Sequence, residues 1–182
     1  RSFECCRIWG AKTIVSHPDT RPEGSSAEQN RAFHAVLLAH AVKNGQRLAL
    51  ENMYGAGKFC VDPQELIDYI DSFSDARIGV CWDFEHGTIE EMDQPPIIRR
   101  LGKRLIATHV SDTASKTYEP LMHLLPFQGE TNWAEIVRVL KETGYEGCLS
   151  LEAHNFLKKL PDALVPAGLS LAYETGRYLL SL

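Results

Sequence analysis

The sequence has no apolar run long enough to cross a bilayer and no signal-peptide pattern at its start. It also lacks an excess of basic residues, because 19 Lys and Arg face 24 Asp and Glu for a net charge of -5. A protein that grips a phosphate backbone normally carries a basic patch. We therefore do not expect a membrane-spanning protein, and a nucleic-acid partner is disfavoured but not excluded.

Cysteine is also too scarce to supply a framework of disulfide bonds. The five cysteines are odd in number and include no CxxC pair, so a set of structural disulfides is not expected. Cys81 and Cys148 lie in apolar, strand-like runs, where a thiol is usually a small core residue. Cysteines that remain free thiols fit a reducing compartment, and we expect a cytoplasmic protein.

What is present is the composition of an ordinary globular domain. The 182 residues are 44% hydrophobic and 24% charged, which suits a single domain over residues 1–182. Short apolar runs predict five strands. They lie at Lys12–Ser16, Arg47–Leu50, Ile78–Trp82, Leu105–Thr108 and Gly147–Leu151.

Helix signals separate these strands. Capping patterns begin at Ser25, at Asp62 followed by Pro63, and at Asn132, and each precedes apolar residues at helical spacing. A short helix is expected just after Pro95 and Pro96, and a final helix, interrupted near Pro166, reaches the end of the chain. Alternating strands and helices predict an α/β fold with a parallel sheet and right-handed crossovers.

Four consecutive predicted strands finish at a residue type that binds metals. These residues are Glu51, Asp83, His109 and Glu152. In a parallel sheet, functional side chains gather where strands end. Three carboxylates placed together without a cation would raise one another's pKa, and a divalent ion removes that conflict. We expect one such ion (manganese, magnesium, cobalt or zinc) held by this fairly hard set of ligands.

Longer motifs around these residues resemble the xylose isomerase-like TIM barrels, a superfamily of sugar isomerases and epimerases related to apurinic-site endonucleases. The motifs are Leu-Glu51-Asn, Trp-Asp83-Phe-Glu-His86, His109-Val-Ser-Asp112, His123-Leu-Leu-Pro-Phe-Gln-Gly129-Glu-Thr-Asn-Trp133 and Glu-Thr-Gly144-Tyr-Glu-Gly147-Cys-Leu-Ser-Leu-Glu152. The resemblance implies a (β/α)8 barrel. Such a barrel takes about 250 residues, so we expect this chain to hold only the last five βα units, with the first three absent.

The resemblance also implies a reaction. We expect a divalent-metal-dependent sugar or sugar-acid isomerase or epimerase that transfers a proton next to a carbonyl through an enediolate. Glu51 and Glu152 would act as acid and base as well as metal ligands. His86 is the substrate contact that the family pattern implies, and His17 and His123 are further candidates. The partner would be a small sugar-derived substrate, and a homo-oligomer is possible.

Three alternatives to this reading stay open. The first is a related dehydratase or lyase that acts on a polyol or sugar acid. The second is a phosphodiesterase of the apurinic-endonuclease type, for which His17, His86 and His123 could be recruited to further metals. The third is a non-catalytic truncated barrel. The roles of Asp112 and His154 are open too: Asp112 either orients His109 or begins a turn, and His154 either reaches the site or caps the next segment.

Overall fold

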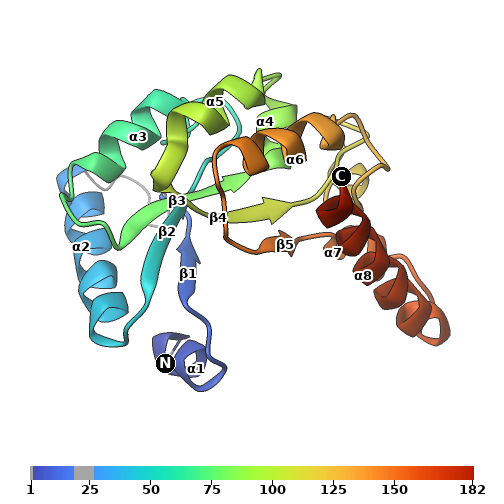
Figure 1. The fold of residues 1–182 in the computed structure, drawn as a ribbon, viewed down its shortest axis with the longest axis horizontal. Helices are drawn as coiled ribbons and strands as arrows, with labels where there is room; N and C mark the ends of the chain where they lie inside the picture. The colour runs from blue at the N-terminus through green and yellow to red at the C-terminus, as the bar shows by residue number, and fades with distance from the viewer. Residues whose placement is uncertain (1, 19–26) are drawn as a thin grey trace. The chain divides into compact units, whose positions relative to one another are not determined.

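The computed structural model describes residues 2–18 and 27–182. Strands and helices alternate along the chain (Figure 1). The strands are β1 (Thr13–Ser16), β2 (Arg47–Glu51), β3 (Ile78–Asp83), β4 (Leu105–Val110) and β5 (Leu149–Leu151). The helices are α1 (Ser2–Ile8), α2 (Ala27–Lys43), α3 (Pro63–Asp71), α4 (Phe84–Ile89), α5 (Gln94–Leu101), α6 (Trp133–Glu142), α7 (His154–Lys158) and α8 (Val165–Ser181).

The sheet follows the order of the chain, β1-β2-β3-β4-β5. Strand β2 pairs in parallel with both β1 and β3, and β4 pairs in parallel with β5. Neighbouring parallel strands joined through helices are the repeating unit of a TIM barrel, which has eight of them. The predicted fold class is confirmed: five strands of an incomplete barrel, each in its expected place.

The chain forms two compact units, and each is described by itself. The first contains Arg1–Trp82 and Lys103–Ala107, and the second contains Asp83–Gly102 and Thr108–Leu182. In the first unit β2 is buried along nearly all its length, as is the part of β3 that belongs to it, as expected for strands covered on both faces. Ala49, Cys81 and Ile106 form one core cluster there, so Cys81 is the core residue that we predicted.

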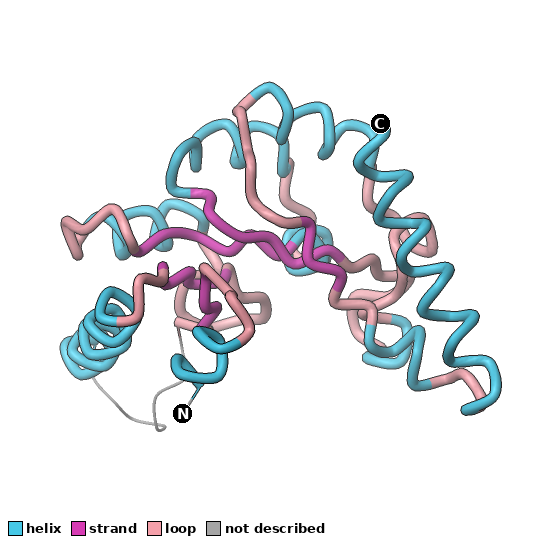
Figure 2. The backbone as a smooth tube through the Cα atoms, turned by 60° about the horizontal axis from the view of Figure 1, so that its bottom comes forward, coloured by secondary structure: helices cyan, strands magenta, loops and turns pink. Residues whose placement is uncertain are grey.

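In the second unit, β4 and β5 run side by side (Figure 2), with Thr108 opposite Leu149. Strand β5 is shorter than predicted, and Cys148 precedes it and is exposed, so its assignment to the core was wrong. The reason is its position: β5 ends the strand order, and an edge strand has a neighbour on one side only. The carbonyl of Cys148 accepts hydrogen bonds from Thr108 Oγ1 (2.8 Å) and the Tyr145 hydroxyl (2.9 Å).

The predicted helix starts are mostly confirmed. Asp62 caps α3 by accepting a hydrogen bond from the Gln64 backbone N–H (2.9 Å), with Pro63 in the first turn. Asn132 caps α6 through the Glu135 N–H (3.3 Å). The pattern at Ser25 lies outside the described residues. In the first turn of α3, the carboxylate of Glu65 accepts the backbone N–H of Cys60 (2.7 Å).

One expectation about proline was wrong. Pro95 and Pro96 do not precede a helix but occupy the first turn of α5. A proline is tolerated there because the first N–H groups of a helix have no partner within it. The predicted interruption near Pro166 is confirmed, since α7 ends before this residue and α8 begins at Val165.

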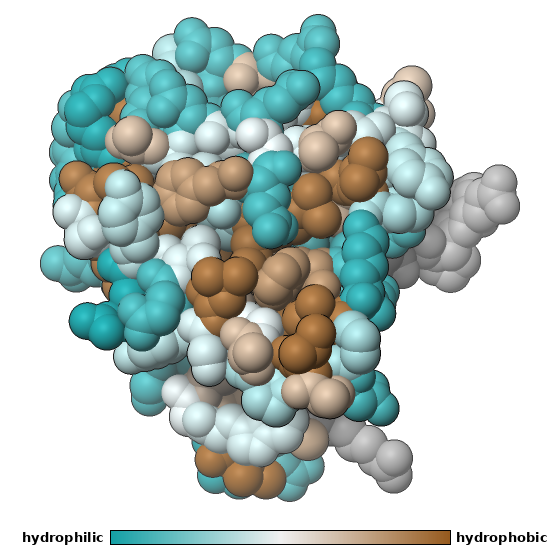
Figure 3. Space-filling view, turned by 90° about the vertical axis from the view of Figure 1, so that its right-hand side faces the viewer, coloured by the Kyte–Doolittle hydropathy of each residue, from teal (hydrophilic) through white to brown (hydrophobic). Residues whose placement is uncertain are grey.

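Helix α8 keeps many large apolar side chains exposed. Figure 3 shows brown, apolar patches on the side of the molecule that carries this helix. The exposed residues are Leu169, Leu171, Tyr173, Tyr178 and Leu180. Patches of this kind mark contact surfaces.

Among the described residues, no helix is both long and apolar enough to cross a membrane.

Candidate metal and active site

Three strand ends of the second unit bring their functional side chains together. His109 Nδ1 lies 2.9 Å from Glu152 Oε2 and 3.9 Å from Asp83 Oδ2. One ligand atom from each of the three residues lies within 4.8 Å of the others. The Asp83 side chain is fully buried, whereas 19% of His109 and 37% of Glu152 remain exposed. The site thus has a buried floor and an open side from which a small molecule can enter.

Asp83 has two functions, one for each carboxylate oxygen. Oδ1 accepts the backbone N–H of His86 (2.9 Å) and so caps α4. Oδ2 lies on the side of the two histidines, 3.8 Å from His86 Nε2 and 3.9 Å from His109 Nδ1. Capping fixes the direction of the carboxylate, because Oδ1 cannot leave the helix start without losing that bond. An Asp after a strand is usually only a cap, and here the cap also positions a candidate ligand.

The donor set suits a divalent cation. Ligand atoms bound tetrahedrally at about 2.1 Å from a metal lie about 3.4 Å from one another, and the distances of 2.9 and 3.9 Å around His109 Nδ1 bracket this value. Two carboxylates and an imidazole admit manganese, magnesium, cobalt or zinc. Asp83, His109 and Glu152 therefore fit a metal by their chemistry and by their spacing.

Glu51, the other predicted ligand, belongs to the first unit. It is the last residue of β2 and is 2% exposed, and its Oε2 lies 3.4 Å from Nε2 of His17. The His17 side chain is 54% exposed. The two residues that sequence analysis assigned to proton transfer and substrate binding are thus adjacent within this unit. The place of Glu51 beside the three ligands stays a prediction.

Glu85 is a buried acid that sequence analysis missed. It is 1% exposed, and its Oε2 accepts the backbone N–H of His123 (2.7 Å). Burial raises the pKa of Glu85 to about 8, and the nearby carboxylates of Asp83 and Asp112 add to the rise. The only sequence signal was a second acid between Asp83 and His86 in the first turn of α4.

His123 and His154 lie next to Glu152. Their ring centroids are 4.2 Å apart at an interplanar angle of 30°, and ligand atoms of His123, Glu152 and His154 lie within 4.8 Å of one another. Burial and the proximity of His154 lower the pKa of His123. Of the two roles left open for His154, the structure supports the one in which it reaches the site.

The loop that carries His123 is held by Asp112. This fully buried carboxylate accepts hydrogen bonds from the backbone N–H groups of Thr113 (3.1 Å), Phe127 (3.0 Å) and Thr131 (3.2 Å) and from Trp133 Nε1 (2.9 Å). In the described part of the chain its side chain makes no hydrogen bond to His109. Asp112 therefore organises the loop, and of the two roles left open for it these contacts favour the one in the turn.

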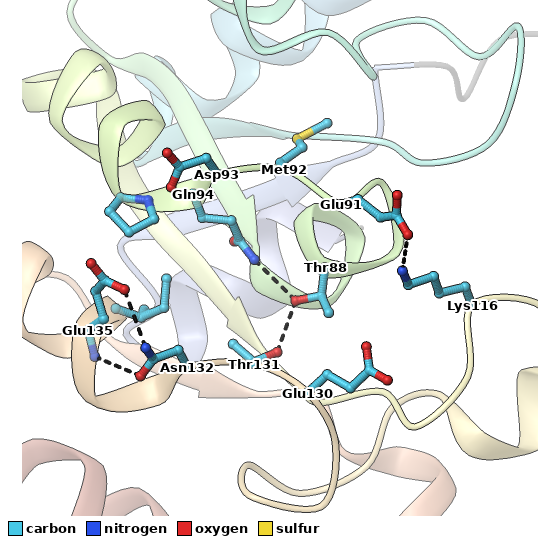
Figure 4. A pocket seen from close by; sticks show the side chains of 12 residues that line it. Thr88, Glu91, Met92, Asp93, Gln94, Lys116, Glu130, Thr131, Asn132 and Glu135 are labelled. Carbon is cyan, nitrogen blue, oxygen red and sulfur yellow. Dashed lines mark hydrogen bonds and ion pairs between the residues drawn. The ribbon is translucent and has the colours of Figure 1, made fainter.

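One surface cavity of the second unit lies apart from these residues. It has a volume of about 450 Å³, and Figure 4 shows its walls, in which Thr88 Oγ1 contacts Gln94 Nε2 (3.1 Å) and Thr131 Oγ1 (2.9 Å). Lys116 pairs with Glu91 at its edge. None of the predicted ligands or substrate contacts lines this cavity, so the candidate site is defined by the strand ends and not by it.

Comparison with known proteins gives matches in sequence and in fold. Residues 1–174 match the family model described as "Xylose isomerase-like TIM barrel". A D-psicose 3-epimerase of Enterocloster bolteae is 29% identical over 89 residues, which is 49% of this chain and 27% of that protein. The chain spans about half the length of two other curated relatives, 47% and 57%.

Solved structures share the fold. The D-psicose 3-epimerase of Clostridium cellulolyticum H10, crystallised with D-tagatose, superposes with a TM-score of 0.74 at 17% identity, covering 98% of this chain and 68% of that one. The IOLI protein with a bound zinc atom gives a TM-score of 0.76 at 18% identity, covering 99% and 66%.

Proposed function

This chain belongs to the xylose isomerase-like TIM barrel family, and we propose that it carries the metal-binding part of a sugar isomerase or epimerase. The observation that carries the proposal is the convergence of Asp83, His109 and Glu152 at the ends of consecutive strands. The D-psicose 3-epimerases among the similar proteins act on ketoses by their names, so the proposed substrate is a small ketose or related sugar.

Four residues would hold the metal: Glu51, Asp83, His109 and Glu152. A divalent ion there would polarise the substrate's carbonyl and stabilise the enediolate that develops when the neighbouring C–H proton leaves. Two distances support this set: the buried Oδ2 of Asp83 lies 3.9 Å from His109 Nδ1, and Glu152 Oε2 lies 2.9 Å from the same nitrogen. Manganese, cobalt, magnesium and zinc all suit this set.

Glu152 and Glu51 would move the proton. Glu152 is partly exposed, so a substrate can reach its carboxylate, whereas Glu51 is nearly buried and has His17 beside it. If one glutamate removes a proton from a carbon and the other, protonated glutamate donates its own proton to the opposite face, the result is epimerisation. Return to the adjacent carbon gives an aldose–ketose isomerisation.

Histidines would orient the substrate. His86 is buried beside Asp83 in the first turn of α4, where an imidazole N–H can donate to a substrate oxygen. His17 and His123 flank Glu51 and Glu152 respectively. We propose that all three contact the sugar. Donors fixed by packing lower the entropic cost of orienting it.

Proton exchange with solvent tests the function. The manganese-loaded chain is incubated with D-psicose, D-tagatose and related ketoses in deuterated water, and deuterium at the carbon next to the carbonyl is followed by NMR. We expect incorporation that falls by at least about 100-fold in Glu152→Gln, since a positioned acid or base contributes about 10²–10⁴-fold. Glu146→Gln, at an exposed residue of the same segment, is the matched control.

Two results would contradict the proposal. One is an absence of exchange with every ketose although the chain is folded and metal-loaded. The other is wild-type exchange in Glu152→Gln. The metal content of each variant is measured in parallel, because Glu152 is also a proposed ligand.

A further inference from the structure

A second group of ligand atoms lies beside the first and shares one member with it. His123, Glu152 and His154 each offer an atom within 4.8 Å of the other two. His123 comes from the loop after β4, Glu152 directly follows β5, and His154 is the first residue of α7. The loop after β4 and the segment that joins β5 to α7 therefore converge on one place.

The ligand atoms are close enough together for one metal ion to gather all three. Two imidazole nitrogens and a carboxylate oxygen bound tetrahedrally at about 2.0–2.1 Å would lie about 3.4 Å apart. The two rings lie 4.2 Å apart at their centroids and 30° from parallel. A carboxylate has two oxygens and can bind one ion with each. Glu152 can therefore bridge this position and the one it shares with His109 and Asp83.

The surroundings favour a ligand over a simple ring stack. Within the described residues, Nδ1 of His123 is buried without a hydrogen bond, and it lies 3.9 Å from the nearest Glu85 oxygen. The backbone at His123 has a φ of 49° and is held by the Glu85 carboxylate (2.7 Å). A non-glycine residue in this conformation is held there by its surroundings.

Asn155 fixes the start of α7, which carries His154. Its side-chain amide donates to the backbone carbonyls of Glu119 (3.0 Å) and Met122 (3.1 Å). These bonds join the start of α7 to the residue before His123. The loop and the helix start are therefore tied together, and both histidines are positioned before any ion arrives.

We propose that His123, Glu152 and His154 bind a second divalent metal ion, with Glu152 bridging the two ions. Two-metal sites place their ions about 3.5–4 Å apart and clamp neighbouring oxygens of one substrate. This inference rests on the metal site of the proposed function, but its test measures metal binding and not sugar chemistry. The second metal site and the proposed function can therefore fail separately.

The test counts ions on the full chain. Wild type is passed through gel filtration in buffer with a fixed low concentration of free Co²⁺, and cobalt per chain is measured by elemental analysis. His154→Phe keeps the ring stack but removes the nitrogens, and His154→Cys supplies a different ligand. His40→Phe, which changes a histidine of α2 stacked on Phe3, is the control.

We expect about two ions in wild type and His40→Phe and about one in His154→Phe. His154→Cys should return to about two and gain a thiolate-to-cobalt absorption band. The inference is overturned if wild type holds about one ion, or if His154→Phe holds as many ions as wild type. About one ion that is lost in His109→Ala but kept in His154→Phe would leave the proposed function standing without the second site. Two ions without sugar exchange would support the second metal site and contradict the proposed function.

Discussion

Replacement of Asp112 by asparagine tests whether one buried carboxylate organises the loop beside the site. The carboxylate accepts four hydrogen bonds, two at each oxygen. Asparagine keeps one oxygen, which should face the closer pair of donors, Phe127 N–H (3.0 Å) and Trp133 Nε1 (2.9 Å). Its NH₂ group then faces the N–H groups of Thr113 and Thr131, so that donors meet donors.

Two hydrogen bonds to a charged group are thus lost, each worth about 1.5–3 kcal/mol. Loop relaxation recovers part of this, and we expect the free energy of unfolding to fall by about 3 kcal/mol. With a urea dependence of about 2 kcal/mol per M, the unfolding midpoint should shift down by about 1.5 M. Tryptophan fluorescence measures it. Asp93→Asn, at an exposed cap position without a side-chain hydrogen bond, should stay within about 0.5 kcal/mol. Equal midpoints for Asp112→Asn and Asp93→Asn would refute the reasoning.

Other perturbations give further expected outcomes. Gly129→Ala would place a Cβ 2.1 Å from the Thr113 carbonyl oxygen, so we expect a loss of about 1–3 kcal/mol in urea unfolding; an unchanged midpoint would contradict this close approach. For Glu85 the folded pKa is raised from 4.5 to about 8, so its contribution to the stability of the metal-free chain is full below pH 4.5 and is lost as pH rises through about 8. Thermal midpoints should fall over that range in wild type and less so in Glu85→Gln, and parallel curves would show that Glu85 is not held protonated.

Much of the fold follows from local patterns. The five strands are apolar runs between helix signals, and Asp62 and Asn132 mark their helix starts because capping depends on neighbouring residues only. The strand-end pattern also located Asp83, His109 and Glu152, since parallel strands place their carboxyl ends at one edge of the sheet.

What sequence did not show depends on contacts between distant segments. The exposure of Cys148 follows from the edge position of β5, which no local pattern reveals. Glu85 reads as an ordinary helix-surface acid, yet the loop around His123 buries it. The four bonds of Asp112 join donors up to 21 residues away, and the approach of His154 to His123 likewise spans two segments.

The most direct test of the account is whether the strand-end residues bind a metal. Cobalt or manganese affinity is measured by titration calorimetry for wild type, His109→Ala and the control His40→Ala. We predict tight binding to wild type and to His40→Ala, and a loss of more than about 100-fold in His109→Ala, beyond what the removal of an outer partner causes. Equal affinity in wild type and His109→Ala, with both proteins folded, would contradict the shared metal site.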